Sequence, residues 1–161
     1  MNHLAPIAQR LALLSILSLQ IIALPTPARA ADPDPGVAVT QADVEKVLGA
    51  KFTSRSPEPG ALFYEEVGGP REVHVYLWWA GGKNVEGMKP SFIANGETID
   101  DVTGIGAAAM YRPQYNEVTV EIAPKPTTDA QWLSISVHNV DKPADTKRLA
   151  IELAKRAAPR L

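Results

Sequence analysis

The segment from Arg71 to Ala80, REVHVYLWWA, constrains the fold more than any other part of the chain. In an extended strand, successive side chains point to opposite faces. One face of this segment carries only large apolar residues, Val73, Val75, Leu77 and Trp79. The other face carries His74, Tyr76 and Trp78. We expect the first face to pack in the core and call the second the outer face.

The same alternation recurs in residues 117–122 and 132–138. The residues expected to face the core are Val118, Val120, Ile122, Leu133, Ile135 and Val137. Those expected on the outer face of the last strand are Trp132, Ser134, Ser136 and His138. The pattern therefore predicts one sheet whose outer face holds His74 and His138.

Capping and turn residues divide the chain into eight elements. Thr40 and Asn84 are suited to begin helices, Gly49 to end the first one, and Pro159 to end the last. The predicted helices cover residues 40–49, 84–93 and 144–157, and the predicted strands cover 62–66, 72–79, 107–111, 117–122 and 132–137. The order α-β-β-α-β-β-β-α predicts an α+β fold with a mainly antiparallel sheet of about five strands and three helices.

The first thirty residues have the pattern of a secretory signal peptide. Arg10 precedes an apolar run over residues 11–24, and Ala28-Arg29-Ala30 is a small-residue cleavage site. The run is shorter than the roughly 20 apolar residues of a membrane-spanning helix. We expect cleavage after Ala30, a flexible lead-in over residues 31–39, and a single α+β domain over residues 40–161. This organisation predicts a periplasmic or secreted protein.

Composition limits the partners and the chemistry. The signal peptide contains two basic residues and no acid, so its removal changes the formal net charge from −2 to −4. An acidic protein is poorly suited to nucleic acid, and we expect membrane contact only through the signal peptide during export. The chain has no cysteine, which excludes a thiol nucleophile and a lipid-anchoring cysteine.

The segment Gly104 to Ala109 satisfies the pattern G-x-G-x-x-A of dinucleotide-binding loops. That loop must follow a buried strand, whereas residues 98–103 are mostly polar and do not read as one, so we expect a structural turn and no cofactor. The sequence motifs of zinc proteases, serine hydrolases and phosphate loops are absent from the chain. We therefore assign no catalytic residue.

Three interpretations of the outer face remain open. A helix or the lead-in covers it as a second small core, it contacts a protein or glycan, or it forms a metal site from His74, His138, Glu65 and Glu121. The predicted binding residues are His74, Tyr76, Trp78, Trp132, Ser134, Ser136 and His138.

Three short motifs support a family resemblance. They are Thr40-x-x-Asp43-Val44-x-x-Val47-Leu48-Gly49, Val102-x-Gly104-Ile105-Gly106-x-Ala108, and a closing helix from Leu149-Ala150 to Leu161. With these motifs the chain resembles small exported bacterial domains of unknown function, similar to those found in actinobacterial lipoproteins and extracellular sensors. The resemblance implies an α+β fold and a role in binding or sensing. The chain departs from it by lacking the lipid-anchoring and paired cysteines of many such domains.

Together these features predict an exported, non-enzymatic binding or accessory domain of the bacterial cell envelope. Its partner would be an envelope protein, a small ligand or a glycan on the outer face. The alternative is a metal-assisted hydrolase that uses histidines and carboxylates of the same face.

Overall fold

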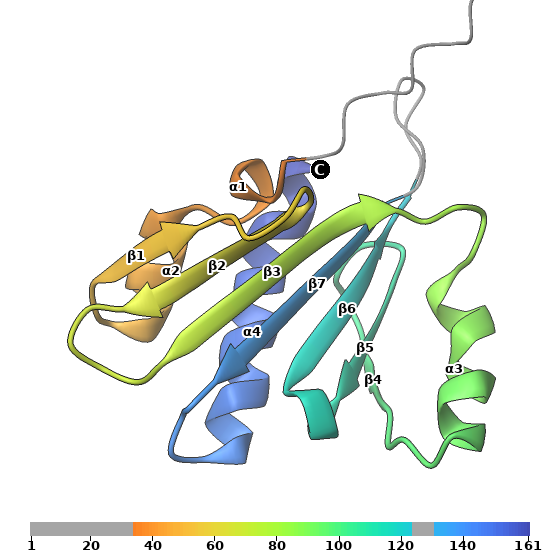
Figure 1. Cartoon of the computed structure of the whole chain (residues 1–161). Coiled ribbons are helices and arrows are strands. Elements are labelled where there is room, and N and C mark those ends of the chain that lie inside the picture. Colours follow the sequence, from red (N-terminus) through yellow and green to blue (C-terminus); the bar gives the residue numbers. More distant parts are fainter. Residues whose placement is uncertain (1–33, 124–130) are drawn as a thin grey trace, which may run out of the picture. The chain divides into compact units, whose positions relative to one another are not determined.

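The computed structural model of the chain describes residues 34–123 and 131–161. The predicted signal peptide and most of the loop before the last strand lie outside the described residues. Within them the fold is α+β with an antiparallel sheet, which confirms the predicted class (Figure 1).

The described residues form one seven-stranded sheet. Its strands are β1 (Phe52–Arg55), β2 (Ala61–Glu66), β3 (Glu72–Trp79), β4 (Asp100–Val102), β5 (Ala108–Arg112), β6 (Glu117–Ile122) and β7 (Gln131–His138). They lie in the order β1-β2-β3-β7-β6-β5-β4, and every neighbouring pair is antiparallel. The last strand in sequence is thus the central strand of the sheet.

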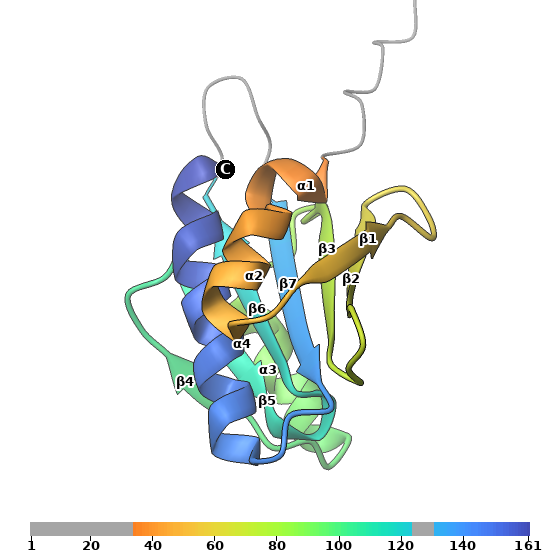
Figure 2. The same ribbon diagram turned by 90° about the vertical axis from the view of Figure 1, so that its left-hand side faces the viewer.

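Helices lie on both faces of this sheet. The four α-helices of the described residues are α1 (Pro35–Ala38), α2 (Gln41–Leu48), α3 (Val85–Ala94) and α4 (Pro143–Ala157), with short 3₁₀ turns η1 (Pro113–Tyr115) and η2 (Ala158–Arg160). Helices α1, α2 and α4 cover the core face, and Figure 2 shows them on one side of the strands. Helix α3 lies on the opposite face, beside β5 and β6.

The predicted counts of five strands and three helices are wrong. Strands β1 and β4 were missed because each is a short edge strand with little apolar alternation, and only Phe52 is buried among the four residues of β1. Helix α1 lies in the predicted flexible lead-in. Its Gly36 is a poor helix former, but Asp34 caps the helix, Pro35 suits the first helical position, and Ala38 and Val39 are buried in the core.

The core lies between the sheet and helix α4. The register pairs Val75 with Ile135 and Ile135 with Val118, so apolar side chains of the three central strands form one continuous row. Leu149 and Leu153 of α4 pack against this layer. Burying such aliphatic side chains contributes roughly 1.5–3 kcal/mol each, so this layer fixes which side chains are left on the outer face.

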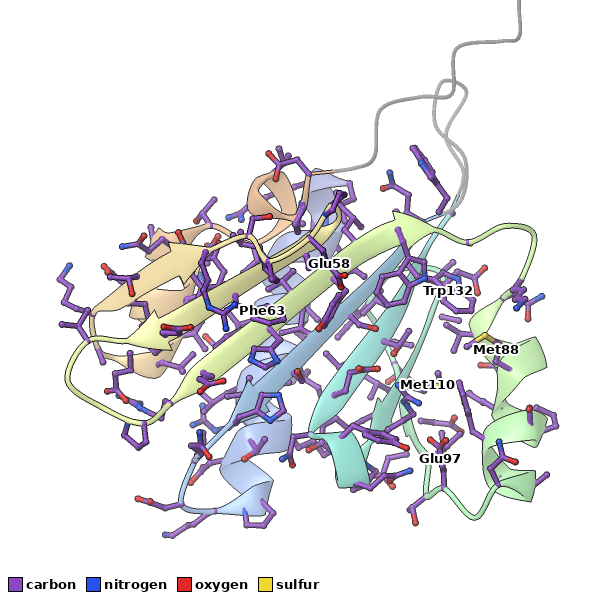
Figure 3. All side chains as sticks on the ribbon, viewed as in Figure 1. Glu58, Phe63, Met88, Glu97, Met110 and Trp132 are labelled. Carbon is purple, nitrogen blue, oxygen red and sulfur yellow. The ribbon has the colours of Figure 1, made fainter. Side chains whose placement is uncertain are left out.

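Two polar links hold α3 on the outer face. The carboxylate of Glu121 on β6 accepts a hydrogen bond from the backbone N–H of Val85 at 2.8 Å, at the first turn of the helix. Lys89 of α3 pairs with Asp101 of β4 at 2.6 Å. Beneath the helix Met110 of β5 is fully buried, and Met88 points from α3 toward the sheet (Figure 3). The outer face of β2, β3 and β7 lies outside this helix contact.

Candidate functional site

Six rings form a continuous array on the outer face, which we call the ring ladder. Its members come from β2, β3 and β7 and are His138, His74, Phe63, Tyr76, Trp78 and Trp132. The register explains the array, because Phe63 pairs with His74 on β2–β3 and Trp78 pairs with Trp132 on β3–β7. Figure 3 looks onto this face and shows Phe63 and Trp132 on it.

The contacts along the ring ladder are close. Phe63 and His74 stack with centroids 4.0 Å apart and planes inclined by 16°. The two imidazoles, His74 and His138, have centroids 4.6 Å apart. Tyr76 contacts Phe63 and Trp78 in edge-to-face geometry at 5.7 and 6.0 Å. The ladder is therefore one packed surface rather than scattered aromatic residues.

The seven predicted binding residues lie on the same face but differ in exposure. Trp78 is 37% exposed, whereas Trp132 is only 6% exposed. Ser134 and Ser136 are also buried, and His74, Tyr76 and His138 are half-buried. The buried Nε1 of Trp132 has no hydrogen-bond partner among the described residues. The face thus offers one exposed indole, one phenol and two imidazoles to a partner.

A shallow cavity of about 320 Å³ opens at one end of the ring ladder. Four predicted residues line it together with the β5–β6 turn, and the full set is His74, Tyr76, Gln114, Tyr115, Asn116, Glu117, Ser136 and His138. The turn residues were not among the predicted site residues. They reach the histidines because β6 and β7 are neighbours, which places Glu117 opposite Ser136.

A hydrogen-bonded network supports the floor of the cavity. One oxygen of Glu117, Oε1, accepts hydrogen bonds from Arg112 at 2.7 Å, Thr119 at 2.8 Å and Ser134 at 3.3 Å. The hydroxyls of Thr119 and Ser134 lie 3.0 Å apart. Because the Glu117 side chain is 16% exposed, these bonds are shielded from water and hold the carboxylate in one place.

Arg112 joins the cavity wall to helix α3. Its guanidinium lies 4.6 Å from the ring centroid of Tyr115 and 4.7 Å from that of Phe92. It also pairs with Glu97 at 3.2 Å. Burial opposes the charge on Arg112, but Glu117 and Glu97 outweigh it and raise its pKa. The turn that carries Tyr115 is therefore fixed by a permanent cation between two rings.

The two histidines have different polar partners. Nε2 of His74 lies 3.0 Å from a carboxylate oxygen of Glu72, and Nε2 of His138 lies 2.8 Å from the Ser136 hydroxyl. Burial lowers the pKa of His138, and the neighbouring His74 lowers it further, against weaker opposite effects of Glu72 and Glu117. The lower pKa favours the neutral form of His138.

The contact between Ser136 and His138 also has a catalytic interpretation, since a serine hydroxyl bonded to an imidazole can act as a nucleophile and base. A triad needs a third group that orients the imidazole, and no described residue bonds the Nδ1 of His138. The two residues are also next-but-one neighbours on a single strand, so the strand alone brings their side chains together. The geometry is accounted for without a reaction.

The two glutamates of the predicted metal site, Glu65 and Glu121, do not join the histidine pair. Glu65 pairs with Arg55 at 2.5 Å, and Glu121 bonds the start of α3. Over residues 34–123 and 131–161, no three or more His, Asp or Glu side chains gather in a way that could hold a metal ion. His74 and His138 remain as a pair beside Glu72 and Ser136.

We compared the chain with protein-family models, curated proteins and solved structures, and none of the three comparisons gave a match. In the part of the chain that the structure describes, no helix is both long and apolar enough to span a membrane.

Proposed function

We propose that this chain is an exported, non-enzymatic binding domain of the bacterial cell envelope, with its ligand or partner on the outer sheet face. The site comprises the predicted residues His74, Tyr76, Trp78, Trp132, Ser134, Ser136 and His138. The observation that carries the proposal is the ring ladder, which has the exposed indole of Trp78 near one end and a cavity at the other.

The composition of the ring ladder favours binding, because neither a face that only contacts water nor a second buried core accounts for these residues. A sheet face that only met water would carry polar side chains, and one that formed a second core would be covered. Here Trp78 is more than a third exposed, and both histidines contribute to an open cavity. Aromatic side chains of this kind supply large contact area together with a polar group, which suits recognition.

The two consecutive tryptophans of β3 provide a matched test of the binding face. Trp78 belongs to the ring ladder, whereas Trp79 points to the opposite face of the same strand. A library of small molecules is screened by NMR, with the Hε1 signals of His74 and His138 as reporters of the cavity. Trp78→Ala should weaken the hits that bind the outer face, and Trp79→Ala should leave their affinity unchanged.

The same screen can refute the proposal. If the hits shift neither histidine signal, or if the two tryptophan variants weaken binding equally, the outer face is not the binding surface. Ester hydrolysis offers a separate check on the non-enzymatic role. Ser136→Ala should leave the rate with p-nitrophenyl acetate unchanged, and a loss of rate would favour a hydrolase.

Export is tested by the N-terminus of the protein recovered after expression in a bacterial host. We expect the chain in the envelope or medium fraction, beginning at Ala31. Recovery of an uncleaved chain in the cytoplasmic fraction would contradict this part of the proposal.

A further inference from the structure

The lining of the cavity next to the histidines combines ring faces with neutral hydrogen-bonding groups. Four of its side chains are rings, His74, Tyr76, Tyr115 and His138. The others include two amides and a hydroxyl, from Gln114, Asn116 and Ser136. Tyr115 is 47% exposed although Arg112 lies over its ring, so a ligand can still reach it.

The charges in and around the cavity are compensated within the protein. Glu117 is the only acid among the described residues of the lining, and its Oε1 pairs with Arg112. Among the described residues no Lys or Arg lines the cavity, and the imidazole of His74 lies 3.0 Å from a carboxylate oxygen of Glu72. Burial and His74 lower the pKa of His138, which favours its neutral form. Among the described residues of the lining, an anionic ligand would therefore meet no Lys or Arg, and a cationic ligand would share the one carboxylate with Arg112.

One acceptor remains available. None of the described residues donates a hydrogen bond to Oε2 of Glu117, although Oε1 receives three. Its neighbour on the opposing strand, Ser136, bonds His138 and also lines the cavity. A carboxylate oxygen held in this way is suited to accept a hydrogen bond from a ligand hydroxyl.

We propose that the cavity binds an uncharged sugar ring, which stacks on the exposed ring of Tyr115 and donates a hydroxyl to Glu117. This inference rests on the proposed binding function and names its ligand class. A sugar presents apolar C–H faces to aromatic rings and hydroxyls to amides and carboxylates, which is the combination found in this lining. The volume of about 320 Å³ is at the small end of the roughly 300–1,000 Å³ of ligand pockets, so one or two rings fit.

The test uses two uncharged disaccharides, maltose and N,N′-diacetylchitobiose, and two charged monosaccharides, glucosamine and glucuronate. Binding is followed by the Hε1 signals of His74 and His138 in the exported protein. We expect an uncharged sugar to shift both signals in a saturable way, and the charged sugars to bind more weakly.

Three variants identify the stacking contact. Tyr115→Ala should weaken binding of the uncharged sugar by about threefold to tenfold, the range for one lost ring contact. Tyr115→Phe keeps the ring and should retain most of the affinity. Ile93→Ala on α3 serves as the control, because Ile93 is 60% exposed and does not line the cavity. Since Tyr115 and Ile93 are both exposed, all three variants should remain folded.

The possible failures are distinguishable. If glucosamine or glucuronate shifts the histidine signals and the uncharged sugars do not, the sugar inference is wrong while the outer face remains a binding surface. If no saccharide shifts them, or if Tyr115→Ala binds like the wild type, the inference is also wrong. The library screen with the Trp78 and Trp79 variants then decides separately whether the face binds any ligand.

Discussion

Two glutamates on the outer face, Glu117 and Glu65, form ion pairs of very different burial, and we expect them to differ in their contribution to stability. Glu117 pairs with Arg112, and both side chains are less than a fifth exposed. Glu65 pairs with Arg55, and both side chains are about half exposed. Each pair joins neighbouring strands. The substitutions Glu117→Gln and Glu65→Gln therefore make the same chemical change in two environments.

The expected magnitudes follow from these contacts. Glutamine at 117 can still accept hydrogen bonds from Thr119 and Ser134, but the charged bond to Arg112 is lost. Hydrogen bonds to charged groups contribute about 1.5–3 kcal/mol when shielded, and Arg112 retains Glu97, so we expect a loss of about 2 kcal/mol. The exposed Glu65 pair should contribute less than about 1 kcal/mol because water screens it.

Urea unfolding followed by tryptophan fluorescence measures this difference. For a domain of this size, a loss of about 2 kcal/mol lowers the urea midpoint by about 1 M, while Glu65→Gln should move it by less than about half of that. If both variants lose the same free energy of unfolding, the claim that burial strengthens the Glu117–Arg112 pair is refuted. An unchanged slope of the unfolding free energy against urea is the control that both variants unfold from the same native state.

Three further predictions concern other parts of the domain. The bonds of Asp43 with Arg160 and with the α2 capping box hold its pKa well below the ordinary value. Their stabilisation is therefore present above about pH 4 and is lost as the pH falls further. In urea unfolding at a series of pH values, Asp43→Asn should reduce the fall in unfolding free energy at acid pH by about 1 kcal/mol. Gly106 and Gly104 both have positive φ, but a Cβ on Gly106 would meet the backbone of β6, whereas one on Gly104 meets nothing within 4 Å. Gly106→Ala should therefore cost about 2–4 kcal/mol in thermal unfolding, against about 1 kcal/mol for Gly104→Ala, and equal costs would contradict the close approach. In an NMR titration the pKa of His138 should lie below the ordinary value near 6.5. In His74→Gln this pKa should rise but stay below the ordinary value, because His138 is still buried. An unchanged pKa would show that the two imidazoles are not coupled.

Most of what could be predicted from the sequence came from the alternation of apolar and polar residues in the central strands. Residues 72–76 of β3 have a strand on both sides, and Val73, Val75 and Leu77 are buried, so the period of two is clear from Val73 to Leu77. The α+β class and the antiparallel sheet followed from such segments. The edge strands could not be predicted in this way, since Asp100 and Asp101 make up most of β4 and neither is buried.

The cavity wall could not be predicted because it depends on strand order. Nothing in the local sequence around Tyr115 distinguishes it from an ordinary turn residue. Only the pairing of β6 with β7, which sets Glu117 opposite Ser136, brings that turn beside His138. The burial of Trp132 likewise depends on its position next to Trp78 and Glu121, which belong to two other strands.

The position of β7 has a consequence for the time at which the site forms. This strand is made last of the seven and is inserted between β3 and β6, which are separated from each other by almost forty residues of chain. Without residues 131–138 the inner edges of β3 and β6 would have no strand partner, and contacts of long sequence separation form slowly. The histidine pair and the cavity therefore cannot form until residues 131–138 have joined the sheet.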